Sequence, residues 1–179
     1  MFVPGYLVAT ATFPGVIVHE LGHKLFCLLT KTRVLQVCYF RVGTPSGYVI
    51  HEPPSTVWKS ILIGVGPLFA NSIIGFLIGM LAGLSFYRLS NLPPVGAILA
   101  WLAVSVAMHA FPSAGDAKVI WKAIWTKGSP LLPRFVGTPV VAFIYAGALG
   151  SMFWLDLLYG TTIAILLPMA ILDHAMLGR

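Results

Sequence analysis

Two histidines and a glutamate lie close together in the segment His19-Glu20-Leu21-Gly22-His23. In a helix, residues four apart share a face, so the imidazoles of His19 and His23 can bind one Zn²⁺. Glu20 is then placed to act as the general base toward a water molecule activated by the metal. The alternative is a polar helix end that contains two histidines by chance. Ionisable groups inside an apolar segment are costly and usually functional, which favours the metal site.

The composition identifies the surroundings of this motif as a membrane. Of 179 residues, 58% are hydrophobic and 9% are charged, and the mean hydropathy is +0.92. An average soluble domain has roughly 25% charged residues, so this chain has too few polar groups to cover a water-exposed surface. We therefore expect one integral membrane domain, residues 1–179, in contact with the lipid bilayer. The net charge of +6 is expected near a membrane face, and no nucleic-acid partner is predicted.

The apolar runs predict an all-α polytopic protein with about five transmembrane helices, at 2–29, 57–84, 93–111, 136–154 and 158–172. The stretch 31–54 is too polar to span and rich in β-prone residues, so it predicts a small membrane-associated β segment between the first and second spans. Residues 113–134 combine lysines with tryptophans, as in an interfacial helix. The short link 156–160 predicts a C-terminal helical hairpin, about 135–177.

The distribution of basic residues predicts the orientation. Five spans place the two termini on opposite sides of the membrane. With the N-terminus outside, ten of the 11 lysines and arginines face the cytoplasm and only Arg88 lies outside. We therefore expect a multi-pass protein of the cell membrane with its N-terminus outside and its C-terminus, ending at Arg179, in the cytoplasm.

Three further segments follow the first motif in order: Ser46-Gly47-Tyr48-Val49, Gly66-Pro67-Leu68-Phe69-Ala70-Asn71 and Phe111-Pro112-Ser113-Ala114-Gly115-Asp116. Together with the HExxH motif they make the chain similar to the site-2 protease family of intramembrane zinc metalloproteases, as a short, divergent member without a PDZ insert. The resemblance implies a protease-like core of about residues 1–117, a third zinc ligand at Asp116 and a substrate contact at Asn71. Asp116 is preceded by glycine and followed by alanine, whereas the family usually has glycine after the aspartate.

His109 is the competing candidate for the third ligand. In an unbroken helix, seven residues would separate His109 and Asp116 by about 10.5 Å along the axis, so one zinc could not bind both. Pro112 and Gly115 favour a helix break that frees Asp116 to turn toward the metal. We therefore predict His19, His23 and Asp116 as ligands, with the fourth position open for water. His109 is expected to contact a ligand or the transition state.

These residues predict an intramembrane metalloprotease with one Zn²⁺ per chain and Glu20 as its catalytic base. Its substrates would be transmembrane proteins, cleaved near the cytoplasmic face. The alternative is a non-proteolytic membrane scaffold or metal-binding subunit that retains the fold. Because a structural zinc site needs no base, the presence of Glu20 favours the protease. A zinc transporter would need polar groups across both leaflets, whereas here they cluster toward one end.

Overall fold

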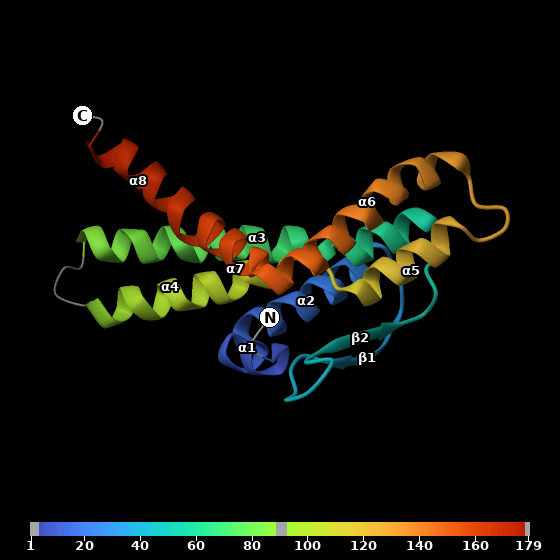
Figure 1. Ribbon diagram of the computed structural model, residues 1–179, viewed down its shortest axis with the longest axis horizontal. Helices are drawn as coiled ribbons and strands as arrows, with labels where there is room; N and C mark the ends of the chain where they lie inside the picture. Colours follow the sequence, from blue (N-terminus) through green and yellow to red (C-terminus); the bar gives the residue numbers. More distant parts are fainter. Residues whose placement is uncertain (1–3, 89–92, 178–179) are drawn as a thin grey trace.

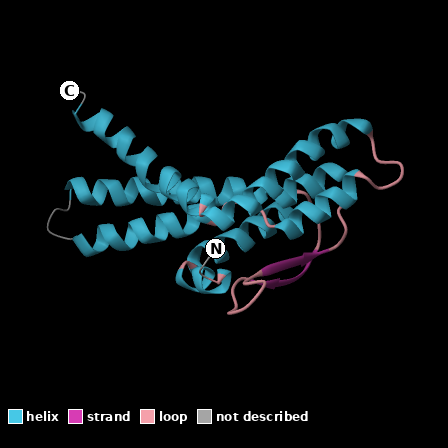
Figure 2. Ribbon diagram, viewed as in Figure 1, coloured by secondary structure: helices cyan, strands magenta, loops and turns pink. Residues whose placement is uncertain are grey.

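A computed structural model describes residues 4–88 and 93–177 of the chain. It is mostly helical (75%) with one two-stranded sheet, which confirms the predicted mixture of helices with a small β segment (Figure 2). The elements in chain order are α1 (Gly5–Ala11), α2 (Phe13–Leu29), β1 (Val34–Cys38), β2 (Tyr48–His51), α3 (Val57–Arg88), α4 (Pro93–Met108), α5 (Ala114–Ile124), α6 (Leu131–Gly150), η1 (Ser151–Phe153), α7 (Leu155–Thr161), η2 (Thr162–Leu166, a π-helical turn) and α8 (Leu167–Leu177).

Three segments of the described chain are long and apolar enough to cross a membrane, at Val57–Phe86, Leu131–Phe153 and Leu155–Met176. They support an integral membrane protein, but they do not confirm five spans. The predicted first span is divided at Thr12, where α1 ends and α2 begins with Pro14 in its first turn. Proline lacks the N–H that a continuous helix would need there, and α2 is left with 17 residues. The predicted third span, α4, has 16 residues.

Helix α3 is the central element, with α2 and α4 packed along it (Figure 1). Two glycines allow unusually close helix contacts. A Cβ atom at Gly15 of α2 would collide with the carbonyl oxygen of Ser105 in α4, and one at Gly79 of α3 would collide with the carbonyl oxygen of Ala164. Small residues at such positions let helix backbones approach one another in a membrane protein.

The C-terminal helices do not form the predicted hairpin. Gly79 of α3 faces Ala164, and Gly83, four residues later, faces Leu172, so α8 runs parallel to α3. Helix α6 packs on α5 and near the start of α3, whereas α7, η2 and α8 pack on α3 and α4. The turn at 151–154 redirects the chain without reversing it, and α6, α7 and α8 follow one another along the long axis (Figure 1). The hairpin prediction for 135–177 is therefore wrong.

This direction also affects the predicted sidedness. Helix α8 ends at the same end of the molecule as α3, whose last residue is Arg88 (Figure 1). The sequence prediction placed Arg88 and the C-terminus on opposite sides, which does not fit two parallel helices. Arg179 itself lies outside the described residues. The side of the membrane that each terminus faces therefore stays a prediction.

The β segment is an antiparallel pair in which Val37 faces Val49 and Cys38 faces Tyr48. Arg41 closes the connecting loop: its backbone N–H donates to the carbonyl of Ser46 at 2.7 Å, and its Nε donates to the carbonyl of Pro45 at 2.8 Å. The hairpin packs against α2, and its second strand reaches the residues of the HExxH motif.

The segment predicted as an interfacial helix is helical only over α5, and α6 begins at Leu131, earlier than expected. Helix α5 is amphipathic: it buries Ile120 and Ile124 in a core formed with Ile61 of α3 and with Val141 and Ile144 of α6. This packing fixes the start of α5, and therefore Asp116, relative to α2 and α3.

Candidate metal centre

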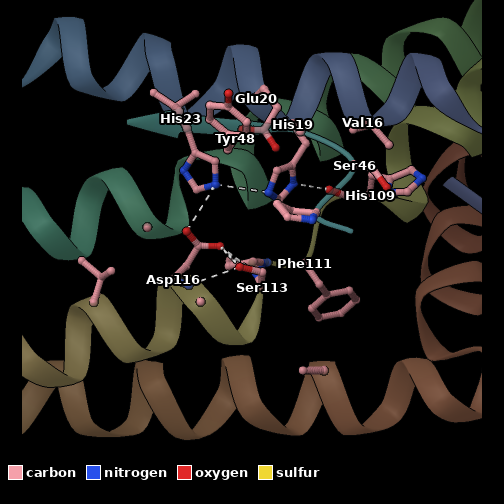
Figure 3. Close-up of a pocket in the computed structure, with 18 of the residues that line it drawn as sticks. Val16, His19, Glu20, His23, Ser46, Tyr48, His109, Phe111, Ser113 and Asp116 are labelled. Atoms are coloured by element: carbon pink, nitrogen blue, oxygen red, sulfur yellow. Dashed lines mark hydrogen bonds and ion pairs between the residues drawn. The ribbon is translucent and has the colours of Figure 1, made fainter. Parts of the chain in front are cut away.

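The structure brings His19, His23 and Asp116 together from two helices far apart in sequence (Figure 3). The Nε2 atoms of the two imidazoles are 3.2 Å apart, and His23 Nε2 is 3.5 Å from Asp116 Oδ1. One ligand atom from each residue lies within 4.8 Å of the other two. The predicted ligand set is thus assembled at one point, between the middle of α2 and the first turn of α5.

Backbone carbonyls fix the orientation of both imidazoles. His19 Nδ1 donates to the carbonyl of His109 at 2.7 Å, and His23 Nδ1 donates to the carbonyl of Ile63 at 2.9 Å. Because a carbonyl oxygen can only accept, each neutral ring carries its hydrogen on Nδ1 and leaves Nε2 as a free acceptor. Histidines that bind a metal through one ring nitrogen typically donate such a hydrogen bond from the other.

Both carbonyls are available for a local reason. Pro67 stands four residues after Ile63 in α3 and has no N–H to donate to that carbonyl. Helix α4 ends at Met108, so the carbonyl of His109 lies beyond the helix. Sequence reasoning missed Ile63, although a proline inside a predicted helix signals a free carbonyl one turn earlier.

Asp116 is held by Ser113, which caps the N-terminus of α5. Asp116 Oδ2 accepts hydrogen bonds from the backbone N–H of Ser113 at 2.7 Å and from its hydroxyl at 2.6 Å. The hydroxyl in turn accepts from the backbone N–H of Asp116 at 3.2 Å. One carboxylate oxygen is therefore occupied by this capping box, and Oδ1 is directed to His23. Sequence reasoning missed Ser113 too, although Ser-x-x-Asp before an apolar helix is the signal for this cap.

The three side chains fit a zinc ion in donor type, and two of their three separations fit it in length. With both Nε2 atoms unprotonated, two nitrogens and a carboxylate oxygen face one another, an arrangement that a cation between them would stabilise. Tetrahedral zinc with bonds of about 2.0–2.1 Å places its ligand atoms about 3.3 Å apart. The separations between His19 and His23 (3.2 Å) and between His23 and Asp116 (3.5 Å) lie close to that value, and the longer one between His19 and Asp116 is within 4.8 Å. Two histidines with one carboxylate are also the ligand type of catalytic sites that keep a fourth position open.

Glu20 lines the same cavity as these three residues and is only 7% exposed. The loop before β2 covers it: a Cβ atom at Gly47 would lie 2.7 Å from Glu20 Cγ and 2.8 Å from its Oε1. The cavity measures about 580 Å³ and extends between α2, the β-hairpin and the junction of α4 with α5. A buried carboxylate beside the ligand cluster is the arrangement that a general base requires.

His109 is not part of the ligand cluster. Its ring Nε2 lies 2.8 Å from the hydroxyl of Thr12, and its contribution to the cluster is the carbonyl that holds His19. It also lines the cavity. The geometry therefore favours Asp116 over His109 as the third ligand, while a contact of His109 with the transition state stays a prediction.

Asn71 does not lie at the cavity. Its side chain is fully buried, and its amide donates to the carbonyls of Gly15 at 3.1 Å and Val106 at 2.9 Å. Through these bonds it connects α2, α3 and α4 just beside the break at Thr12. The structure thus places Asn71 as an interhelical contact, away from the position expected of a residue that touches substrate.

No protein-family model matches this chain, and neither the curated proteins nor the solved structures contain a match to it.

Proposed function

We propose that the protein is an intramembrane zinc metalloprotease that hydrolyses peptide bonds of transmembrane proteins. The observation that carries the proposal is the convergence of His19, His23 and Asp116, with Glu20 beside them in one cavity. The HExxH spacing alone requires neither a third ligand at the same point nor hydrogen bonds that fix both imidazoles. The apolar helices support a membrane-embedded site.

The residues of the chain divide the chemistry among them. His19, His23 and Asp116 would hold Zn²⁺, which supplies a Lewis acid that polarises a peptide carbonyl and acidifies water. Glu20 accepts a proton from the attacking water and delivers it to the leaving amine nitrogen when the peptide bond breaks. The carbonyls of Ile63 and His109 and the hydroxyl of Ser113 keep the ligands oriented, so that little reorganisation accompanies the reaction.

The position of the β-hairpin favours a peptide as the substrate. Its residues at the cavity come from β2 and the loop before it, including Gly47, Tyr48 and Val49. In the described part of the chain β2 pairs only with β1, so its other edge has free backbone groups. A substrate helix that has unwound can pair with such an edge, which presents its carbonyls for attack. Non-helical backbone at membrane depth is tolerated where protein covers it.

The proposed orientation differs from the sequence prediction at the C-terminus. Basic residues gather at the end of the molecule where α2 ends, α3 begins and α5 connects to α6 (Figure 1): Lys24, Lys31, Arg33, Lys59, Lys118, Lys122, Lys127 and Arg134. The positive-inside rule favours the cytoplasm for this end. Because α8 runs parallel to α3, we assign the end of α8 to the opposite side, together with Arg88.

The test is cleavage of a library of single-span transmembrane peptides by the purified chain in detergent. Glu20→Gln should abolish cleavage and keep the metal, because only the base is lost. The matched control is Glu52→Gln, which removes an exposed carboxylate paired with Arg33 at 3.5 Å outside the cavity. We expect this control to cleave like the unmodified protein. Cleavage at an undiminished rate by Glu20→Gln would refute the mechanism.

A further inference from the structure

The outer face of α5 and the start of α6 form a surface that the proteolytic chemistry does not use. Helix α5 buries Ala117, Ile120 and Ile124, which leaves the opposite face to Lys118, Trp121, Lys122 and Trp125. After the turn at Gly128, Leu131, Leu132 and Phe135 are 79%, 64% and 82% exposed. We call these exposed residues, with Lys127 and Arg134, the α5–α6 patch.

The aromatic and basic side chains of this patch are held in place. The rings of Trp121 and Trp125 lie 5.5 Å apart, centre to centre. The guanidinium carbon of Arg134 lies 5.4 Å from the centre of the Trp125 ring, and its Nε donates to the carbonyl of Ile124 at 3.1 Å. The arginine is therefore stacked on the indole instead of extending freely into solvent.

The charge of the patch is of one sign. Between residues 117 and 135 the chain carries four basic residues, at 118, 122, 127 and 134, and no aspartate or glutamate. Its ligand should therefore be an anion, and the exposed leucines and phenylalanine require an apolar neighbour beside it. A phospholipid surface offers both, since phosphate groups border the acyl chains, whereas a nucleic acid offers no hydrocarbon.

The position of the patch agrees with this ligand. It belongs to the end of the molecule where basic residues gather, and tryptophan with lysine is the pairing found at headgroup level.

We infer that the α5–α6 patch is a binding site for anionic phospholipid headgroups. The lysines supply positive charge for the phosphates, and the tryptophans with Leu131 and Phe135 supply the apolar contact beside them. The inference does not depend on proteolysis, because it requires only the membrane location and the exposed face of α5.

The experiment measures quenching of tryptophan fluorescence in the purified full-length chain by brominated phosphatidylglycerol and by brominated phosphatidylcholine. We expect stronger quenching by the anionic lipid, and loss of that difference in the double variant Trp121→Phe/Trp125→Phe. A lysine near an anionic surface contributes roughly fivefold in affinity, so Lys118→Gln/Lys122→Gln should reduce the preference for phosphatidylglycerol by up to about 30-fold.

The matched control is Lys31→Gln/Arg33→Gln, which removes two exposed charges from the β-hairpin side. It should reduce the preference less than Lys118→Gln/Lys122→Gln does, because these charges lie outside the α5–α6 patch. Equal quenching by both lipids in the unmodified chain, or an equal loss in the control, would overturn the inference. Absence of quenching by either lipid would also overturn it. Circular dichroism of each variant shows whether its helices are intact, and titration of the native chain with both lipids provides the same comparison without substitution.

Discussion

Replacing Ser113 with alanine removes the hydroxyl that donates to Asp116 Oδ2 at 2.6 Å and accepts from the backbone N–H of Asp116 at 3.2 Å. Loss of an N-cap hydroxyl typically costs about 1 kcal/mol and at most about 2 kcal/mol. If this energy holds the carboxylate toward His23, its loss raises the zinc dissociation constant by about 5–30-fold. That range overlaps the roughly 10–100-fold effect of outer contacts on metal affinity.

The assay is a zinc titration in competition with a chromogenic chelator. Ser113→Thr retains a hydroxyl and should restore most of the affinity. Ser151→Ala is the matched control, because Ser151 lines the same cavity but its hydroxyl donates to the carbonyl of Ala148 instead of to a ligand. A zinc affinity of Ser113→Ala within twofold of the unmodified chain would refute the reasoning, as would an equal loss in Ser151→Ala.

Three further comparisons test separate parts of the account. Asp116→Ala should lose most of its zinc, whereas His109→Ala should keep its zinc and lose part of its activity. Metal analysis and cleavage assays of the two variants distinguish these outcomes. The reverse result would make the site a three-histidine centre. Gly47→Ala should slow cleavage at unchanged zinc content, because its Cβ would lie 2.7 Å from the motif glutamate; a normal rate would contradict the close cover of that carboxylate. Gly15→Ala should destabilise the fold by about 1–3 kcal/mol, seen as a lower thermal midpoint in detergent, whereas Gly5→Ala, where a Cβ has open space, should not.

The ligand cluster could be predicted because its information is local. The four-residue spacing of His19 and His23 fixes their shared helical face, and Pro112 marks the helix break that brings Asp116 to the same point. Capping by Ser113 is equally local and was overlooked. These features depend on backbone geometry within one or two turns, which the sequence specifies directly.

The arrangement of the helices could not be predicted in the same way. An apolar run has the same composition whether it crosses the membrane alone or continues a preceding helix. Hydropathy therefore does not indicate that α8 runs parallel to α3. It depends on contacts such as Gly79 with Ala164 and Gly83 with Leu172. The contacts of Asn71 could not be predicted either, because a sequence motif does not indicate which carbonyls the amide will hydrogen-bond.

The central claim is that one zinc ion binds between α2 and α5, and metal analysis of the purified chain tests it most directly. The account predicts about one zinc per chain, and a loss of that zinc in His19→Ala/His23→Ala. His51→Ala/His174→Ala is the matched control, because it removes two histidines outside the ligand cluster and should leave the metal content unchanged. Zinc retained in full by His19→Ala/His23→Ala, or absent from the unmodified chain after purification without chelators and addition of zinc, would contradict the account.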